Sequence, residues 1–445
     1  MDPAGIRAWI LCDERVGRGD LQGNGIICPG MGSDSDLERP GDWDRMAVPG
    51  RPDAYDIEKG RSRKTIARRR SVRISMDPEN VLVTGGAGFI GSNFVRYLLR
   101  AEPAVRVINL DALTYAGSVE NLKNLPEAEA GASGEVTGAR HTFVHGDVGD
   151  RELIEGLLKK HRIDTIVHFA AETHVDRSIM GPELFIKTNV LGTLSLLEVA
   201  WKYWGLERSI GGRETRFHHI STDEVFGSLG PGEEAWTEDA PYAPHSPYAA
   251  SKASSDHLVR AYGHTHGLPY TITNCSNNYG PYQFPEKLVP LMISNALEGN
   301  PLPIYGDGRQ IRDWLYIDDH CEAIGTVVRK GRPGETYNVG GGVQPTNLEI
   351  VEKLCAALDE ARPDSRYVPH KSLMKFVADR PGHDRRYAID SAKIRAELGW
   401  KPRHALEEGL KKTIEWYLRH PEWLAAVRAQ GDYRDWIARN YGRRS

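Results

Sequence analysis

The sequence contains few cysteines, and they show no paired spacing. Five cysteines occur among 445 residues, namely Cys12, Cys28, Cys275, Cys321 and Cys355. Such spacing indicates neither a disulfide framework nor a zinc site. We therefore expect buried or inert thiols and no bound metal ion.

Long apolar segments and an excess of one charge are also missing. No apolar run approaches the roughly 20 residues that a helix needs to cross a bilayer, and no segment has the basic, apolar and small-residue order of a secretory signal. The formal net charge is only −4, whereas binding to nucleic acid requires a concentrated basic surface. We expect a cytoplasmic protein with neither nucleic acid nor a membrane as partner.

Residues 1–75 lack a sustained hydrophobic period. They are rich in Gly, Pro, Asp and Arg and contain a basic run from Lys59 to Arg70, a composition that predicts a disordered N-terminal extension. Two alternatives stay open. The segment is a basic arm for nucleic acid or an anionic membrane, or translation starts at Met76, just before the first predicted strand.

The remaining chain has ample material for a large core, because 40% of the whole sequence is hydrophobic. From Asn80 onward, strand patterns alternate with helix patterns, which predicts an α/β fold built on a doubly wound parallel Rossmann sheet, with a second, smaller α/β domain. The predicted strands are 80–84, 105–110, 141–145, 165–170, 216–221 and 270–274. The predicted domains are 76–278 and, mainly, 279–425, followed by a C-terminal tail over 426–445.

A glycine-rich loop follows the first predicted strand within 80–92. Gly85 permits a tight turn, Gly88 lets the backbone approach a pyrophosphate, and Gly91 allows the next helix to pack closely on the strand. The N-terminus of that helix would face the phosphates. A glycine-rich turn that binds no ligand is the alternative.

Acidic and small residues at the ends of the next strands extend this pattern. Asp111 lies 20 residues beyond Gly91, where an acidic residue binds ribose hydroxyls. A carboxylate there repels a 2′-phosphate, so we expect NAD rather than NADP. Asp147 ends the third strand beside a possible adenine, and the fourth strand ends in Ala170 and Ala171, which allows a cofactor to lie close against it.

The strand at 216–221 runs directly into three candidate catalytic residues, Thr222, Asp223 and Glu224. They lie at the carboxyl edge of the predicted sheet, where open α/β sheets bind ligands. The alternative is that the two acids only cap a turn or a helix.

Tyr248 and Lys252 follow at helical spacing i and i+4, which places them on one helix face. The ammonium group can then hold a positive potential near the phenol. We expect this potential to lower the pKa of Tyr248 from about 10 toward neutrality, as a general base for an alcohol requires.

Longer motifs resemble the extended short-chain dehydrogenase/reductase family, most closely its members that dehydrate a nucleotide sugar. The similarity covers about 80–420. Two positions depart from the family pattern, because Phe226 and Thr173 stand where tyrosine and often serine occur. The motifs are 84–91, 113–117, 170–178, 221–227, 248–252, 274–280, 312–316 and 379–383.

The resemblance implies an NAD-dependent lyase that acts on dTDP-glucose in deoxysugar biosynthesis, such as that of rhamnose. Tyr248 would take the proton of the sugar 4-hydroxyl, held by Thr222, while hydride leaves carbon 4. Glu224 would then remove the proton from carbon 5, Asp223 would protonate the departing 6-hydroxyl, and hydride would return to carbon 6. An epimerase or decarboxylase on the same fold and a non-catalytic binding module remain alternatives, and the preferred base stays open.

The resemblance also implies two sets of binding residues. Those for NAD are Gly85, Gly88, Phe89, Ile90, Gly91, Asp111, Ala112, Leu113, Thr114, Asp147, Val148, Phe169, Ala170, Ala171, Thr173, Thr188, Tyr248, Lys252 and Asn278. Those for the nucleotide sugar are Thr173, Thr222, Asn277, Lys287, Leu288, Pro303, Ile304, Tyr305, Arg312, Asn347, Asp379, Arg380, Pro381, Gly382 and His383.

The last expectations concern two cations that bind the substrate and two helices that form a dimer interface. Lys287 and Arg312 are expected at the diphosphate, with a surface charge or an internal ion pair as the alternative. A long amphipathic helix over 182–204 and the helix that carries 248–262 are expected to form a homodimer.

Overall fold

The computed structural model describes residues 76–442, except 124, 126–128, 131–135, 138–139 and 206–208. The extension over 1–75 lies outside the described residues. A nine-stranded sheet has the order β14-β10-β9-β6-β1-β2-β5-β4-β3, and its strands from β14 to β5 are parallel. The strands are β1 Asn80–Thr84, β2 Arg106–Asp111, β3 Glu129–Ala130, β4 Val136–Thr137, β5 His141–His145, β6 Thr165–His168, β9 Arg216–Thr222, β10 Tyr270–Cys275 and β14 Glu335–Val339.

The order of the strands reverses at β1. The chain first moves from β1 through β2 to β5, and then crosses back to β6 on the other side of β1. The carboxyl ends of neighbouring strands therefore diverge between β1 and β6, which is where open α/β sheets bind ligands. All six predicted strands are present, and the predicted doubly wound parallel sheet is confirmed.

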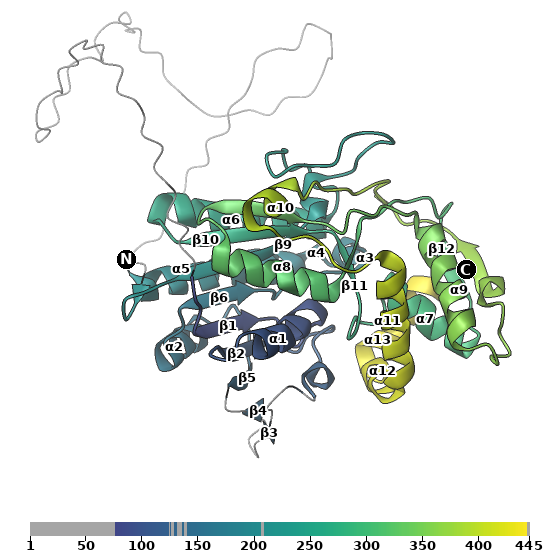
Figure 1. Cartoon of the computed structure of the whole chain (residues 1–445), viewed down its shortest axis with the longest axis horizontal. Coiled ribbons are helices and arrows are strands. Elements are labelled where there is room, and N and C mark those ends of the chain that lie inside the picture. The colour runs from purple at the N-terminus through teal and green to yellow at the C-terminus, as the bar shows by residue number, and fades with distance from the viewer. Residues whose placement is uncertain are drawn as a thin grey trace, which may run out of the picture. The chain divides into compact units, whose positions relative to one another are not determined.

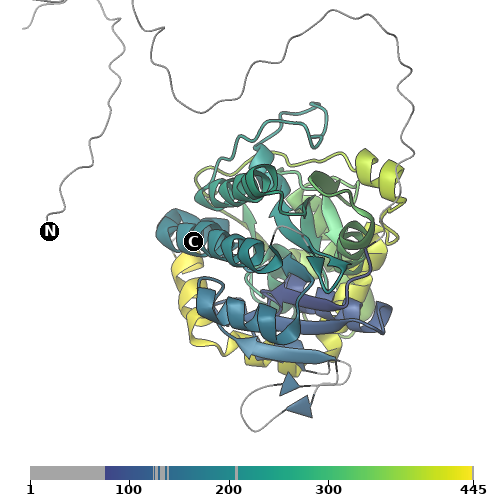
Figure 2. The same cartoon turned by 90° about the vertical axis from the view of Figure 1, so that its left-hand side faces the viewer.

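Helices cover both faces of this sheet (Figures 1 and 2). Along β1, Val81 and Val83 point into the core that contains α1 and α8, whereas Leu82 points into the core on the opposite face. This alternation follows from the two-residue period of a strand. The covering helices are α1 (Phe89–Ala101) and α8 (Ile317–Lys330) on one face, and α2 (Arg151–His161), α5 (Thr193–Trp204) and α6 (Pro247–His266) on the other.

The smaller part of the fold is built on two short parallel strand pairs, β11 with β13 and β12 with β15. The chain beyond residue 278 also returns to the large sheet, since β14 pairs with β10. The remaining elements are β11 Asn277–Tyr279, β12 Leu302–Tyr305, β13 Trp314–Tyr316, β15 Met374–Val377, α3 Val175–Met180, α7 Leu288–Glu298, α9 Asn347–Ala361, α10 Ala392–Leu398, α11 Leu406–Arg419, α12 Pro421–Arg428 and α13 Gly431–Gly442, with short 3-10 helices over Val119–Leu122, Asp223–Phe226 and His370–Leu373 and a hairpin of β7 (Ser209–Ile210) with β8 (Arg213–Glu214).

The C-terminal segment is more ordered than a tail. Helix α13 buries Tyr433 and Trp436 against the body of the protein. The Arg177 guanidinium lies 4.1 Å from the ring centre of Tyr115 and 4.4 Å from that of Trp436. Such cation–aromatic contacts are attractive, so α13 is tied to α3, at whose centre Arg177 lies.

The predicted helix over 182–204 is present as α4 (Pro182–Phe185), a π-helical segment (Ile186–Gly192) and α5. The expectation that no apolar segment is long enough to cross a bilayer is wrong for this helix, which passes that test of length and composition as the one such helix among the described residues. Half of its most apolar window is buried inside the protein. A core helix of a soluble protein passes the same test.

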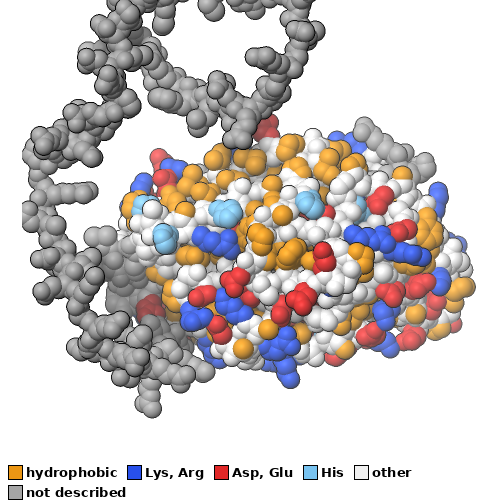
Figure 3. Space-filling view, turned by 90° about the horizontal axis from the view of Figure 1, so that it is seen from above, with side chains coloured by type: hydrophobic (Ala, Val, Ile, Leu, Met, Phe, Trp, Pro, Cys, Tyr) orange, Lys and Arg blue, Asp and Glu red, His pale blue; other side chains and the backbone are white. Residues whose placement is uncertain are grey.

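Figure 3 shows that hydrophobic side chains gather in the upper part of one face of the molecule, above most of the charged ones.

Candidate active site

The glycine-rich turn lies against the end of β6. Gly85 has a φ of +72°, and a Cβ atom added to it would lie 2.6 Å from the backbone nitrogen of Ala170. A Cβ on Gly91 would lie 2.2 Å from the carbonyl oxygen of Gly85, so α1 can approach the turn only through glycine. Gly88 is the N-cap of α1 and contributes no side-chain bond, which leaves the first backbone N–H groups of the helix available to a ligand.

Asp111 lies at the end of β2 and holds this turn together. Its carboxylate accepts hydrogen bonds from the backbone nitrogens of Ala87, at 2.8 Å, and Leu113, also at 2.8 Å. Burial raises the pKa of Asp111, although these backbone bonds and His145 oppose the increase. Each carboxylate oxygen has a second lone pair, so both can also accept from ribose hydroxyls.

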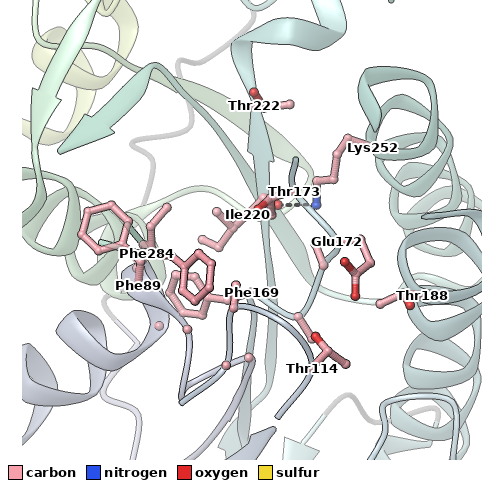
Figure 4. Close-up of a pocket in the computed structure, with 18 of the residues that line it drawn as sticks. Phe89, Thr114, Phe169, Glu172, Thr173, Thr188, Ile220, Thr222, Lys252 and Phe284 are labelled. Atoms are coloured by element: carbon pink, nitrogen blue, oxygen red, sulfur yellow. Dashed lines mark hydrogen bonds between the residues drawn. The ribbon is translucent and has the colours of Figure 1, made fainter. Parts of the chain in front are cut away.

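One cleft contains the glycine turn, Asp111 and the predicted catalytic residues. In Figure 4 the rings of Phe89, Phe169 and Phe284 gather on one side of this cleft, while Thr222 and Lys252 approach it from another. All five predicted catalytic residues and every predicted NAD-binding residue except Leu113 line it. Four of the predicted substrate-binding residues also line it, namely Thr173, Thr222, Asn277 and Lys287.

Several other predicted substrate-binding residues form a second cluster, in which Gln310 links Asp379 to Asn347. The side chain of Gln310 donates to Asp379 at 2.9 Å, and its backbone carbonyl accepts from Asn347 at 2.9 Å. Nδ1 of His383 lies 2.6 Å from Asp379, and its ring centre lies 6.3 Å from that of Tyr305. Pro303 and Ile304 belong to β12, which pairs with β15, Pro381 and Gly382 lie in the segment from Asp379 to His383, and Leu288 begins α7.

The two adjacent acids have different surroundings. Asp223 is 2% exposed, and its Oδ2 has no hydrogen-bond partner within the part of the chain that the structure describes. Burial, together with the nearby carboxylates of Glu224 and Asp313, raises the pKa of Asp223 well above its usual value. Burial also raises the pKa of Glu224, but the cations Arg380, Arg312 and Lys287 oppose that increase.

The expectation that Lys252 brings the pKa of Tyr248 toward neutrality is wrong for this structure. Burial raises the pKa of Tyr248 well above 10, and the carboxylate of Glu224 adds to the effect. The ammonium group of Lys252 donates instead to the carbonyl oxygen of Ile220 at 2.7 Å, as Figure 4 shows. The sequence spacing predicted the shared helix face, but neither the burial of the phenol nor the direction of the lysine.

Three comparisons with known proteins agree with this geometry. A family model described as GDP-mannose 4,6 dehydratase matches residues 82–413. A dTDP-glucose 4,6-dehydratase from Xanthomonas campestris pv. campestris (strain B100) is 56% identical over 353 residues, which cover 79% of this chain and 97% of that protein. The dTDP-glucose 4,6-dehydratase 1 of Escherichia coli (strain K12) is 51% identical over 369 residues, covering 81% and 98% of the two chains.

The chain belongs to the dTDP-glucose 4,6-dehydratase family. A solved member of the family from Streptomyces venezuelae, with NAD and TYD bound, is 46% identical and superimposes with a TM-score of 0.69, covering 78% of this chain and 99% of that one. A UDP-glucose 4-epimerase from Thermotoga maritima is more distant, with 31% identity, a TM-score of 0.64 and coverage of 76% and 99%.

Phe226, which departs from the usual tyrosine of the dTDP-glucose 4,6-dehydratase family, does not reach the cleft. It is 1% exposed and packs against Trp236 and Tyr242. The cleft is also lined by residues that were not predicted as site residues, among them Glu172, Gln283 and Phe284. Glu172 lies inside a motif that carries the family resemblance, which was the available signal, whereas Gln283 and Phe284 follow no recognisable pattern.

The close approach of Gly85 to Ala170 predicts the effect of Gly85→Ala. A left-handed backbone costs an ordinary residue about 1–2 kcal/mol, and the new Cβ would displace the end of β6. We expect lower stability and a dissociation constant for NAD at least about tenfold higher, measured by urea unfolding and calorimetry. The matched control is Gly156→Ala in α2, where a Cβ would meet nothing within 4 Å and alanine should stabilise the helix by about 1 kcal/mol. Equal behaviour of the two variants would contradict the role of Gly85.

Proposed function

We propose that the protein catalyses the NAD-dependent dehydration of dTDP-glucose to dTDP-4-keto-6-deoxyglucose, a hydro-lyase reaction. The observation that carries this proposal is the adjacent pair of the buried Asp223 and the partly buried Glu224 beside Tyr248 and Lys252 in one cleft. A dehydration needs both an acid for the leaving hydroxyl and a base for a carbon-bound proton. We place this activity in the cytoplasm, as the sequence predicts.

The residues around the glycine turn fit NAD. A diphosphate would be held by the backbone N–H groups of α1, and the adenosine ribose by Asp111. When bound, NAD⁺ would supply a hydride acceptor for the oxidation at carbon 4 and, once reduced, the hydride donor for carbon 6. The other predicted NAD-binding residues would position the two nucleosides, and residues 76–278 would form most of this part of the site.

The oxidation requires that Tyr248 take the proton of the sugar 4-hydroxyl. Thr222 shares a hydrogen bond with Tyr248 that lowers the pKa of the phenol, against the larger effect of burial. Additional positive charge must therefore reach the phenol. Lys252 would supply it, since a lysine side chain can turn on its flexible stem from the Ile220 carbonyl into the cleft.

The elimination assigns opposite roles to the two acids. Asp223, whose pKa is raised well above its usual value, would carry a proton and donate it to the departing 6-hydroxyl. Glu224 faces cations that favour its ionised form, so it would remove the proton from carbon 5. Once carbon 4 is a ketone, that proton is acidified by the adjacent carbonyl, which makes a carboxylate an adequate base.

The substrate diphosphate would lie among the cations that oppose the increase in the pKa of Glu224. These are Arg380, Arg312 and Lys287, of which Arg312 offers a planar fork suited to phosphate oxygens. The cluster around Gln310, with Tyr305, Asn347, Asp379 and His383, would hold the nucleoside end. Residues 279–425 would thus mainly bind the nucleotide sugar.

An epimerase is the second candidate, because a UDP-glucose 4-epimerase has a similar fold. An epimerase needs the redox step but no paired elimination acids, so Asp223 and Glu224 favour the dehydratase. Incubation of the purified protein with dTDP-glucose is expected to yield a 4-keto-6-deoxy sugar, identified by NMR. A 4-epimer would contradict the proposal, as would bound sugar without turnover. The same assay with UDP-, CDP- and GDP-glucose would rank the bases by kcat/KM.

The separate roles of Tyr248 and Glu224 predict different kinetic blocks. Glu224→Gln keeps the size of the side chain but cannot accept the carbon 5 proton at neutral pH, so turnover should fall by roughly 10²–10⁴-fold. Carbon 4 should still be oxidised, and the absorbance of reduced nicotinamide should rise in a single-turnover mixing experiment. Tyr248→Phe is the contrasting variant, because without the phenol this absorbance should not rise quickly. If both variants accumulate reduced nicotinamide at the same rate, the assigned roles are wrong.

The proposed active form is a homodimer. An exposed apolar surface surrounds the first turns of the 182–204 helix, with Ile179 at 42%, Met180 at 56%, Leu184 at 50%, Ile186 at 46% and Leu191 at 53% exposure. Apolar side chains gathered on a helix face in this way favour association with another protein surface. A second copy of the chain is the occupant that the family resemblance favours.

The dimer proposal is tested by light scattering. We expect the unaltered protein to have twice the chain mass of 49.6 kDa. The double variant Leu184→Asp/Leu191→Asp should approach the mass of one chain, because dimerisation would bury two carboxylates of each copy in an apolar interface. Phe376→Asp is the matched control, since Phe376 is 58% exposed on β15 and lies outside this surface. A monomeric unaltered protein at micromolar concentration would contradict the proposal.

A further inference from the structure

Two residues of opposite charge, Lys252 and Asp256, lie on the face of α6 that carries Tyr248. Nε2 of His219 lies 3.2 Å from Oδ1 of Asp256 and 3.4 Å from Nζ of Lys252. Asp256 and His219 are fully buried, and Lys252 is 5% exposed. Lys252 lines the cleft, whereas Asp256 and His219 lie deeper. The carboxylate of Asp256 and the ammonium group of Lys252 therefore both lie close to the same ring nitrogen, and all three side chains are buried.

Asp256 is stabilised as an anion by hydrogen bonds from β9 and from the loop before α6. Its Oδ2 accepts hydrogen bonds from the hydroxyls of Ser221, at 2.7 Å, and Tyr242, at 2.8 Å. Burial by itself raises the pKa of Asp256, but the polar contact with His219 and the charges of Lys252 and Arg260 outweigh burial and hold this pKa below its usual value. A buried carboxylate that stays ionised needs such partners.

His219 contributes no second charge to this cluster. Burial, followed by the nearby Lys252, lowers the pKa of His219 to about 4, so the ring is neutral near pH 7. Its Nδ1 makes no hydrogen bond among the described residues. The ring therefore separates Lys252 from Asp256 without neutralising either of them, and the electrostatic effect of Asp256 reaches the ammonium group.

Lys252 needs this anion because its burial disfavours the charged form. Burial lowers the pKa of Lys252 to about 8, and Asp256 and then Cys275 oppose that decrease. An isolated ammonium group buried to this extent loses its proton more readily still. A neutral Lys252 could bond to a ribose hydroxyl, but it could not supply positive charge to Tyr248.

We propose that Asp256 is a positioning residue that keeps Lys252 positively charged for the redox step. This inference rests on the proposed function and deepens it. Asp256 touches neither the cleft nor any reacting atom, and it acts only through Lys252. It completes a functional series along α6 at positions 248, 252 and 256, four residues apart and so on one face of the helix.

The other ionisable groups near Lys252 do not replace Asp256 as the anion that stabilises its positive charge. Three of them are buried and neutral at pH 7, because burial lowers the pKa of His168 and of His219 and raises that of Cys275. Asp223 and Glu224, at the end of β9, raise the pKa of Tyr248 and therefore oppose its loss of a proton. Arg260, on α6, is a cation that stabilises the ionised Asp256.

The test removes the charge of residue 256 while preserving its bonds. In Asp256→Asn the amide oxygen can accept from Ser221 and Tyr242, and the amide nitrogen can donate to Nε2 of a neutral His219 protonated at Nδ1. Asp256→Ser also lacks the charge, and Asp256→Glu retains it. If one uncharged variant does not fold, the other carries the test. Asp239→Asn removes an exposed carboxylate and is the control for net charge.

Two readouts are compared on the holoenzyme. The first is the pH profile of kcat/KM with dTDP-glucose, in which the loss of activity at high pH should move to lower pH by about 1–3 units in the uncharged variants. The second is the titration of Lys252 itself, followed by the pH dependence of the NMR shift of its Cε in isotope-labelled protein and identified as the difference from the same protein carrying Lys252→Met. Lys252 should lose its proton at lower pH when Asp256 is uncharged.

The two readouts separate the possible outcomes. Profiles that follow charge, with Asp256→Glu close to the unaltered protein, support the proposal. An unshifted Asp256→Asn or Asp256→Ser profile overturns it, as does an equal shift in Asp256→Glu, because Asp256 would then matter only for packing. If the unaltered protein does not convert dTDP-glucose, the proposed function fails, but the titration of Lys252 still decides the role of Asp256.

Discussion

Removal of charged side chains from water is the constraint on which the rest of this site depends. Burial raises the pKa of a carboxylic acid and lowers that of an ammonium group, so one physical effect acts in opposite directions on Asp223 and Lys252. The neighbours then decide the outcome for each group. Arg312 opposes the increase for both acids, but Arg380 and Lys287 also oppose it for Glu224, whereas Asp313 adds to it for Asp223. Two adjacent acids thereby acquire different proton affinities.

The parallel sheet makes this burial possible. Strand β9 lies between β6 and β10, and all of its residues are buried. Its carboxyl end meets α6 on one side and the strand that ends at Cys275 on the other, since Cys275 pairs with Thr222. The acids, the tyrosine and the lysine thus approach one point from elements whose positions are fixed by backbone hydrogen bonds, and no flexible loop is needed to bring them together.

The sequence was sufficient to predict what depends on local pattern. The strands, the glycine turn and the i, i+4 spacing of Tyr248 and Lys252 all follow from short-range rules, and all are present. It was insufficient where distant segments meet. Three features depend on contacts between different elements, which no local pattern relates. They are the return of β14 to the large sheet, the bonds from Ser221 and Tyr242 to Asp256, and the packing of Phe226 away from the cleft. The raised pKa of Tyr248 is of this kind, because burial is a property of the whole fold.

Helix α13 contacts residues near the proposed substrate-binding positions without lining the cleft itself. Arg177, held between Tyr115 and Trp436, lies 3.2 Å from Glu286, the residue before Lys287, and Asn440 lies 3.2 Å from the hydroxyl of Tyr305. Helix α13 therefore contacts residues beside the proposed diphosphate and nucleoside positions, although none of its residues lines the cleft. Substitutions in this helix would change the affinity for the nucleotide sugar while leaving every reacting group in place.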